Sequence, residues 1–341
     1  MRHSLLITIL AAATLLLAAC NLFCGSVSIP AEQVLDILTG GEAEKASWHY
    51  IVIGSRLPQT ITAMLCGAAL AVSGLMLQTA FRNPLAGPSI LGITNGASLG
   101  VALVMLFSGG VLGSGMVMGD SVLALTGVWA VIMSAFLGAL MVIALLLSLS
   151  QVINSNMMLL ILGIMVSYLT SSVVALLNYF ADSDNVHSYV MWGMGSFGDV
   201  TLKQLPWFAS TCLVGLVLAI LQIKPLNALL LGNNYAASLG VNIRRTMAML
   251  LIATGLLTAS ATAFCGPVAF IGLAVPHIAR LTVRTADHRI LVPATILTGS
   301  ALALLCNVIC ILPENTIIPI NAVTPLFGAP VIIYIIWKEK K

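Results

Sequence analysis

The chain has 341 residues, of which 60% are hydrophobic and 7% charged, and its mean hydropathy is +1.08. A soluble domain carries about 25% charged residues on average, so this composition excludes a soluble enzyme or soluble binding domain. The net charge of +3 is spread along the chain without a basic patch, which argues against a nucleic-acid partner. Long apolar runs without the alternation of barrel strands predict an all-α, polytopic transmembrane helical bundle.

Apolar runs separated by polar breaks predict about ten spans, since a bilayer core requires about 20 apolar residues per helix. They lie at 4–24, 58–80, 89–107, 121–148, 157–180, 206–223, 246–264, 268–281, 291–312 and 323–337. The eighth run is short and is interrupted by Pro276, so we expect a broken helix there. The first run ends at Cys20, which fits either a first span or a lipoprotein-like signal, and we favour the span.

The distribution of charge predicts the orientation of the bundle. If both termini are cytoplasmic, 11 of the 14 Lys and Arg residues fall on the cytoplasmic side. These are Arg2, Arg82, Lys224, Arg244, Arg245, Arg280, Arg284, Arg289, Lys338, Lys340 and Lys341. Nine of the 11 acids then fall outside: Glu32, Asp36, Glu42, Glu44, Asp120, Asp182, Asp184, Asp199 and Glu314.

Two absences from the sequence restrict the mechanism. The chain has no G-x-x-x-x-G-K-[ST] loop to cradle phosphates, so we do not expect it to be an ATPase. No carboxylate lies within a predicted span, although ion-coupled transporters normally keep an ionisable relay there. His277 comes close, and a structural role at the membrane interface explains it equally well. We therefore expect a passive element that another protein drives.

Three polar segments interrupt the apolar pattern. Arg56 is a cation among the predicted outer acids, where it can anchor the chain at the membrane interface or dock an acidic partner. Two prolines and a glycine in 82–88 predict a rigid turn. The segment 224–245 predicts two short amphipathic helices, the second ended by Gly240, that form either a surface-lying connector or a docking surface.

Small residues and cysteines inside the apolar runs have simple interpretations. Gly92, Gly96 and Gly100 are spaced for close helix packing, within the chain or at a subunit interface. Most of the seven cysteines lie in apolar runs without a C-x-x-C pair and are expected to act as small hydrophobic side chains. Cys306 and Cys310 share one helical face, so a metal pair there is an alternative.

Several stretches resemble the iron-siderophore, haem and vitamin B12 group of ABC importer permeases, the FecCD type. They are RLPQTITAMLCGAALAVSGLMLQTAFRNPLAGPSILGITNGASLG (56–100), MWGMGSFGDV (191–200), LLLGNNYAASLGVNIRR (229–245), GPVAFIGLAVPHIARL (266–281), DHRILVP (287–293) and VTPLFGAPVIIYIIWK (323–338). Together they cover nearly the whole chain in the order found in that family, which also includes the membrane subunit of the vitamin B12 importer.

The resemblance implies one transmembrane permease domain, 1–341, with the type II importer fold of ten spans and a location in the inner membrane. It implies a homodimer with a substrate path along its axis, two ATP-binding-cassette ATPase subunits and a substrate-binding protein outside. ATP and Mg would bind to the ATPases, and no cofactor to this chain. The cargo would be an iron chelate, as siderophore or haem, or cobalamin.

The resemblance also assigns residues to roles, with 226–243 forming the coupling helices that contact the ATPase. Within that segment the ATPase contacts would be Leu231, Gly232, Ala236, Ser238, Leu239 and Gly240. The cytoplasmic gate would comprise Asn83, Leu85, Asn156 and Met157. The translocation path would be lined by Ser167, Thr170, Ser171 and Ser172, together with the last span. Arg56 would pair with a carboxylate of the binding protein.

The sequence departs from the family pattern at its outer end. Gln59 replaces a second arginine, and the stretch around Asn307 lacks the usual Asp and Arg. We therefore expect an altered docking surface and the loss of one salt bridge. An ion-coupled secondary transporter and a non-transporting receptor or scaffold remain the two alternatives.

Overall fold

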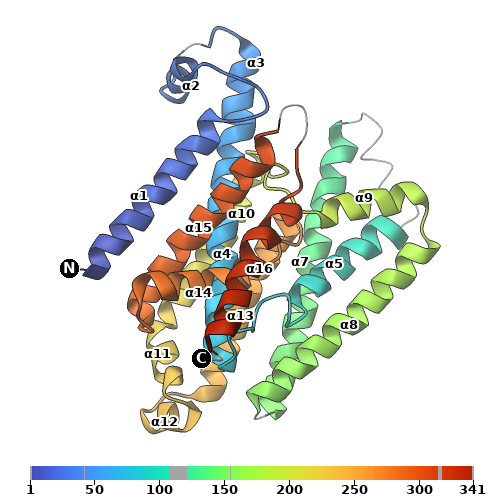
Figure 1. Cartoon of the computed structure of the whole chain (residues 1–341). Coiled ribbons are helices and arrows are strands. Elements are labelled where there is room, and N and C mark those ends of the chain that lie inside the picture. The colour runs from blue at the N-terminus through green and yellow to red at the C-terminus, as the bar shows by residue number, and fades with distance from the viewer. Residues whose placement is uncertain (1, 42, 108–120, 154, 314–316, 340–341) are drawn as a thin grey trace.

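The computed structural model describes residues 2–41, 43–107, 121–153, 155–313 and 317–339. Glu42, Asp120, Glu314, Lys340 and Lys341, which contributed to the predicted charge pattern, lie outside these ranges. The described residues form helices joined by turns and short irregular segments, and no strand occurs among them (Figure 1). The all-helical architecture predicted from composition is thus confirmed for the part of the chain that is described.

The long helices are, in chain order, α1 (Arg2–Phe23), α4 (Leu57–Phe81), α7 (Ser121–Val152), α8 (Asn156–Phe180), α10 (Leu205–Leu221), α13 (Ile243–Cys265), α15 (His288–Ile311) and α16 (Ile320–Glu339). Shorter helices lie between them: α2 (Ala31–Leu38), α3 (Ala46–His49), η1 (Tyr50–Arg56), α5 (Ile93–Ala102), η2 (Leu103–Phe107), α9 (Ser183–Gly193), α11 (Ile223–Leu230), α12 (Asn233–Ser238) and α14 (Ile271–Val283). Each of the ten predicted apolar runs overlaps at least one of these helices.

Helix length supports fewer full crossings than ten. Six helices of the described chain are long and apolar enough to cross a membrane, or seven if α10 and α11, bent by 50°, form one span. Three further apolar helices are shorter: Ile93–Leu106, Ile271–Val283 and Ile320–Ile335. The eighth helix, α14, is short as predicted, but it is not broken at Pro276, which lies inside the continuous helix Ile271–Val283. The interruption comes before it, in an irregular segment in which Phe270 has a φ of 65°.

Helix α4 is the centre of the bundle and is packed against α10, α13, α14 and α15. In the apolar stretch that contains it, 83% of the most hydrophobic window is buried. Pro58 lies in its first turn, where the missing N–H needs no partner. Since all its faces are covered by protein, its sequence is apolar and small all round rather than amphipathic.

Glycines let the backbones of neighbouring helices touch at several sites. Gly74 of α4 lies against the carbonyl of Gly272 in α14, and Gly100 of α5 lies against the carbonyl of Ser134 in α7. A Cβ atom at either position would overlap backbone, which cannot move away as a side chain could. Such contacts drive helix association in lipid, where there is no hydrophobic driving force between helices. Gly96 likewise packs against α7, which confirms the intramolecular interpretation for Gly96 and Gly100.

The two ends of the bundle differ. Helices α2 and α3 lie at one end, whereas α11 and α12 lie at the other, which is also where α16 ends (Figure 1). The turn after α4 is at the same end as α11, because α4 and α11 contact each other. This end therefore brings together the predicted coupling segment and one half of the predicted gate.

Replacement of Gly74 by Val should destabilise the bundle by about 1–3 kcal/mol, because the new side chain would force α4 and α14 apart. Gly193→Ala is the matched control, since a Cβ there meets no atom within 4 Å. Thermal unfolding in detergent measures the difference. Equal midpoints for Gly74→Val and the wild type would contradict the packing described.

Candidate functional site: a coupling surface joined to a turn at the end of α4

The coupling segment forms a surface with both buried and exposed positions. Gly232 and Ala236 are buried, whereas Leu231, Ser238, Leu239 and Gly240 are exposed. Leu239 is 59% exposed although it is a large apolar side chain at the polar end of the bundle. The predicted end of the second short helix is confirmed: Gly240 has a φ of 85°, and the N–H of Val241 bonds the carbonyl of Ala236.

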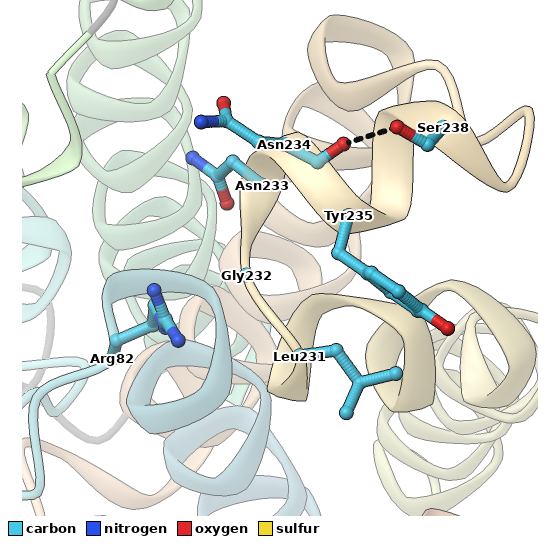
Figure 2. A pocket seen from close by; sticks show the side chains of 7 residues that line it. All are labelled: Arg82, Leu231, Gly232, Asn233, Asn234, Tyr235 and Ser238. Atoms are coloured by element: carbon cyan, nitrogen blue, oxygen red, sulfur yellow. Dashed lines mark hydrogen bonds between the residues drawn. The ribbon is translucent and has the colours of Figure 1, made fainter.

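A pocket of about 590 Å³ opens between this segment and the end of α4. Its lining residues are Arg82, Leu231, Gly232, Asn233, Asn234, Tyr235 and Ser238 (Figure 2). Arg82 is the only charged residue in this set, and it lies beside Gly232. The side-chain oxygen of Asn233 is buried without a hydrogen-bond partner. The pocket is therefore suited to a partner that offers a carboxylate and hydrogen-bond donors.

Arg82 occupies a conformation that is unusual for its residue type. It follows α4 with φ 50° and ψ 38°, the left-handed position at which glycine is preferred. Its N–H bonds the carbonyl of Thr79, and the N–H of Asn83 bonds that of Gln78, which completes a Schellman motif. A non-glycine residue in this region costs about 1–2 kcal/mol. Strain retained at a cationic position points to a use for the side chain.

The turn that contains Asn83 and Leu85 is fixed by hydrogen bonds on both sides. The Asn83 side-chain oxygen accepts from the N–H of Leu85 at 2.9 Å. The amide of Gln78 donates to the carbonyl of Leu273 at 3.0 Å, and Nε2 of His277 lies 2.8 Å from the carbonyl oxygen of Pro84. The turn is thereby attached to α14, and Leu85 is left exposed at its tip. His277 thus has a structural contact, in line with the simpler of its two interpretations.

The other two gate candidates lie at the start of α8. Asn156 is the first residue of that helix, and its side chain lies outside what the structure describes. Met157 is 72% exposed. Ser155 caps the helix by accepting from the N–H of Met158. The structure thus places both gate pairs at helix ends.

A chain of side-chain hydrogen bonds, which the sequence did not predict, connects α11 to α4 through the start of α15. Asn227 of α11 donates to the Asp287 carboxylate at 2.6 Å and accepts from the backbone N–H of His288 at 2.8 Å. The same oxygen lies 2.7 Å from Nδ1 of His288, and Nε2 of His288 lies 2.9 Å from the Thr79 hydroxyl. An amide oxygen only accepts, so Nδ1 of His288 carries the proton and Nε2 of the neutral ring is an acceptor. The Thr79 hydroxyl also lies 3.0 Å from the carbonyl oxygen of Leu75, so its single proton is shared between that carbonyl and Nε2. Thr79 lies three residues before Arg82.

Asp287 anchors this chain outside the membrane-spanning segments. The backbone N–H of Arg289 and the amide of Asn227 hold the pKa of the Asp287 carboxyl below its ordinary value of 3.8. Both bonds favour the ionised form. Asp287 is also the N-cap of α15, where a negative charge is favourable.

Because this pKa is lowered in the folded state, the ionised carboxylate stabilises the fold above about pH 4. That contribution disappears as the pH falls through the folded-state pKa. Asp287→Asn should therefore lower the unfolding temperature at pH 7, and the gap to the wild type should close towards pH 3. Thermal unfolding in detergent across this range measures it. A gap that persists unchanged at pH 3 would mean that the charge is not what matters.

The opposite end of the bundle corrects the expectation for Arg56. Its side chain is only 5% exposed, not an exposed cation available for docking. The guanidinium donates to the carbonyls of Leu22 and Phe23 at 3.0 Å and also to that of Val27. These carbonyls lie at the end of α1 and just after it, where no intrahelical donor remains. Arg56 thus fastens α1 to the helix that continues into α4.

Arg56→Gln should destabilise the bundle by about 2 kcal/mol, because buried carbonyls lose charge-assisted partners. The exposed Lys203 provides a control, and Lys203→Gln should leave the unfolding temperature unchanged. If Arg56 instead served only to dock another protein, its replacement would leave stability intact, and the capping role would be refuted.

A second set of residues that the sequence did not reveal joins three helices near this end. Gln59 of α4 donates to the side-chain oxygen of Asn307 in α15 at 3.1 Å, and Asn307 donates to Asn21 of α1 at 2.6 Å. A neutral amide chain therefore occupies the positions at which the family resemblance led us to expect charges. Gln59 and Asn307 also line a cavity of about 450 Å³ beside α9 and the start of α16.

The four candidate path residues on α8 do not form one exposed stripe. Ser171 and Ser172 are exposed, Ser167 is partly buried and Thr170 is buried. The amide of Asn95 on α5 donates to the Ser167 carbonyl at 3.3 Å and to the Ser171 hydroxyl at 3.4 Å. Thr170 bonds back to the carbonyls of Val166 and Ser167. Ser171 and Ser172 are the two that are available to a solute.

The remaining sequence candidates are also located. The irregular residues 268–270, the first residues of α14 and the turn 87–90 line a small cavity of about 130 Å³, so the interrupted backbone before α14 is covered by protein. No group of three or more His, Cys, Asp or Glu side chains suited to a metal ion occurs among the residues that the structure describes. Cys306 and Cys310 are buried free thiols.

Multiple apolar helices, a central helix covered on all sides and polar segments confined to the ends define a multi-pass membrane protein of the permease class. The chain belongs to the FecCD transport family, which matches residues 11–338. It is a permease subunit of the metal-chelate, haem and vitamin B12 type of ABC importer and is not itself an enzyme.

Individual relatives agree with this assignment. The hemin transport system permease protein HmuU of Yersinia pestis is 35% identical over 298 residues, 87% of this chain and 85% of the relative. The vitamin B12 import system permease protein BtuC of Klebsiella pneumoniae is 35% identical over 301 residues, 88% of this chain and 86% of the relative. A solved structure described as an inward-facing conformation of a metal-chelate type ABC transporter superimposes with a TM-score of 0.83 at 29% identity, covering 97% of this chain and 98% of the other.

Proposed function

We propose that this chain carries a metal chelate, as iron-siderophore or haem, or cobalamin, across the inner membrane when ATPase subunits bound at α11 and α12 hydrolyse ATP. The observation that carries the proposal is the hydrogen-bond chain Asn227–His288–Thr79, because it joins the coupling surface to the turn of Asn83 and Leu85. Family membership supports both partners, an ATPase pair and a substrate-binding protein.

The proposed topology has ten crossings and both termini in the cytoplasm. The three short apolar helices would complete the count as shortened or broken crossings, which are tolerated where protein covers their ends. The excess of Lys and Arg at the end that carries α11 and α12 supports a cytoplasmic position for that end.

A second copy of the chain is proposed to cover α8. Only 22% of the most hydrophobic window of this helix is buried, and its exposed residues include Ser171 and Ser172 as well as large apolar side chains. The Ser171 hydroxyl accepts from Asn95 of α5, and exposed polar groups on a transmembrane helix are better placed against protein or a water-filled path than against lipid. A homodimer would place them along a central path, where they offer weak, uncharged contacts to a bulky solute.

In the proposed cycle, closure of the ATPases moves α11 and α12 as one unit. The bonds of Asn227 to Asp287 and His288 transmit that movement to the start of α15, and the bond of His288 to Thr79 transmits it to α4. The gate residues Asn83 and Leu85 then move relative to Asn156 and Met157. Such a transition requires two discrete packings rather than continuous deformation.

Arg82 supplies a sharp test of where the ATPase binds. Arg82→Gly should stabilise the isolated permease by about 1 kcal/mol, because glycine fits the left-handed position. It should also weaken ATPase binding about tenfold, because a charge-assisted contact is lost. Thermal unfolding measures the first effect, and co-purification with a candidate ATP-binding-cassette ATPase subunit measures the second.

Arg284→Gly is the matched control. Arg284 is an exposed arginine with a φ of 53° after α14, but it does not line the pocket beside α12. The Arg284→Gly variant should gain the same stability as Arg82→Gly but should bind the ATPase as the wild type does. Full ATPase binding by Arg82→Gly would remove Arg82 from the coupling surface.

The two rival functions lose support from the family match. An ion-coupled transporter would continue uptake after ATP depletion and stop when the ion gradient collapses. A receptor or scaffold would show no uptake at all. Reconstituted vesicles with ATP inside and haemin, cobalamin or an iron-siderophore outside distinguish the three possibilities, and uptake that requires ATP supports the importer.

A further inference from the structure

Two adjoining hollows lie between α14 and α16, away from the coupling pocket. The first has a volume of about 410 Å³ and is lined by Ile278, Leu281, Thr282, Pro330, Val331 and Tyr334. The second has a volume of about 340 Å³ and is lined by His277, Arg280, Leu281, Tyr334, Ile335 and Lys338. Leu281 and Tyr334 line both, so the hollows form one continuous groove with an apolar part and a cationic part.

The charges in this groove are of one sign. Arg280 and Lys338 line it, and no acid is among the lining residues. The amine of Lys338 lies 5.9 Å from the ring centroid of Tyr334, which holds it over the groove. Both cations come from the last turns of their helices. The cationic part is therefore at the level where a helix leaves the hydrocarbon.

On α16 the apolar part runs back from the helix end, from Tyr334 to Pro330, whereas on α14 it lies level with Arg280. Ile278 and Thr282 lie one turn apart on α14, and Pro330 and Tyr334 are similarly spaced on α16. Pro330 offers no backbone N–H to this surface. The side chains of Leu281 and Tyr334 are exposed on it. In a bilayer this surface faces either an acyl chain or another protein.

We propose that this groove binds an anionic phospholipid, with an acyl chain against Ile278, Leu281 and Val331 and the phosphate between Arg280 and Lys338. An apolar hollow joined to a pair of cations indicates this class of ligand. Basic pockets between transmembrane helices at the cytoplasmic side suit anionic headgroups. A free phosphate would use only the cationic part, and a zwitterionic lipid would leave the positive charge unbalanced.

The position of the groove also suggests a consequence for the permease. His277 lines the cationic part, and its Nε2 contacts the carbonyl of Pro84 in the turn after α4. A lipid in the groove would therefore favour the packing in which α14 holds this turn. Lipid composition would then bias the gate without contacting the substrate or the ATPase.

Native mass spectrometry of the purified full-length protein tests the site, with phosphatidylglycerol and phosphatidylcholine added in equal amounts. The wild type should retain phosphatidylglycerol preferentially, and a large excess of inorganic phosphate should not displace it. Arg280→Gln and Lys338→Gln should each reduce the preference about fivefold. Leu281→Trp, which fills the apolar part without changing charge, should reduce binding of both lipids at this site.

The matched control is Arg284→Gln, an exposed cation one turn beyond Arg280 on the same side of the membrane. It should keep the wild-type preference. An equal loss in Arg284→Gln would mean that general surface attraction is responsible, and the site would be refuted. An unchanged preference in Lys338→Gln, which lies at an exposed helix end and is compatible with folding, would also refute it. If Leu281→Trp dissociated a dimer and left lipid binding intact, a second copy and not lipid would fill the groove.

Discussion

The last carbonyl groups of a helix have no partner within the helix and need hydrogen bonds from elsewhere. In α4 these bonds come from the turn at Arg82 and Asn83, and the rest of the site depends on that turn. Its Schellman turn forces Arg82 into the left-handed region, and this strain turns the chain sharply towards Asn83 and Leu85. The same turn of helix presents Thr79 to His288 and Gln78 to α14. A single helix end thus fixes Arg82 in the pocket beside α12, the turn of Asn83 and Leu85 that is the predicted gate, and the bond that leads to α11.

The rest of the bundle holds this helix end in place. Close backbone contacts at Gly74 and other small residues cover α4 with neighbours, so its end can move only when the neighbours move. Arg56 and the amide chain through Asn307 tie the opposite end to α1 and α15. In hydrocarbon, polar groups have only each other as partners, which makes such links specific. Movement is consequently expected at the helix ends and not within the packed middle.

Much of the fold could be predicted from local sequence signals. The apolar runs located the helices, Gly266-Pro267 marked the interruption after α13, and Gly240 marked the end of α12, because each of these signals acts through nearby backbone. Pro276 was a false signal, since it lies inside the continuous helix α14. The turn that follows Arg82 was likewise predicted from local sequence, by the two prolines and the glycine in 82–88. In the first short helix, α11, Leu226 and Leu229 are buried, but Leu230, which the sequence pattern placed on the same face, is exposed.

The errors and omissions share a physical cause, which is that the partners are distant in sequence. Arg56 looked exposed because it lies among the predicted outer acids, whereas its partners are carbonyls about 30 residues earlier. Gln59 and Asn307 were noted only as departures from a family pattern, and their contact spans 248 residues. The link from Asn227 to His288 was missed for the same reason, since a lone asparagine and a histidine carry no shared spacing. Helix lengths in three dimensions likewise did not reach the ten full crossings that hydropathy suggested.

The central claim is that ATPase movement reaches the gate through the bond between His288 and Thr79. The most direct measurement is the number of ATP molecules hydrolysed per substrate imported, in vesicles that contain the assembled transporter. Thr79→Val removes the hydroxyl and keeps the shape, while Thr254→Val removes a buried hydroxyl that bonds only carbonyls of its own helix. The account predicts that Thr79→Val keeps its ATPase activity and raises the ratio about fivefold, with Thr254→Val unchanged. A wild-type ratio in Thr79→Val would contradict it.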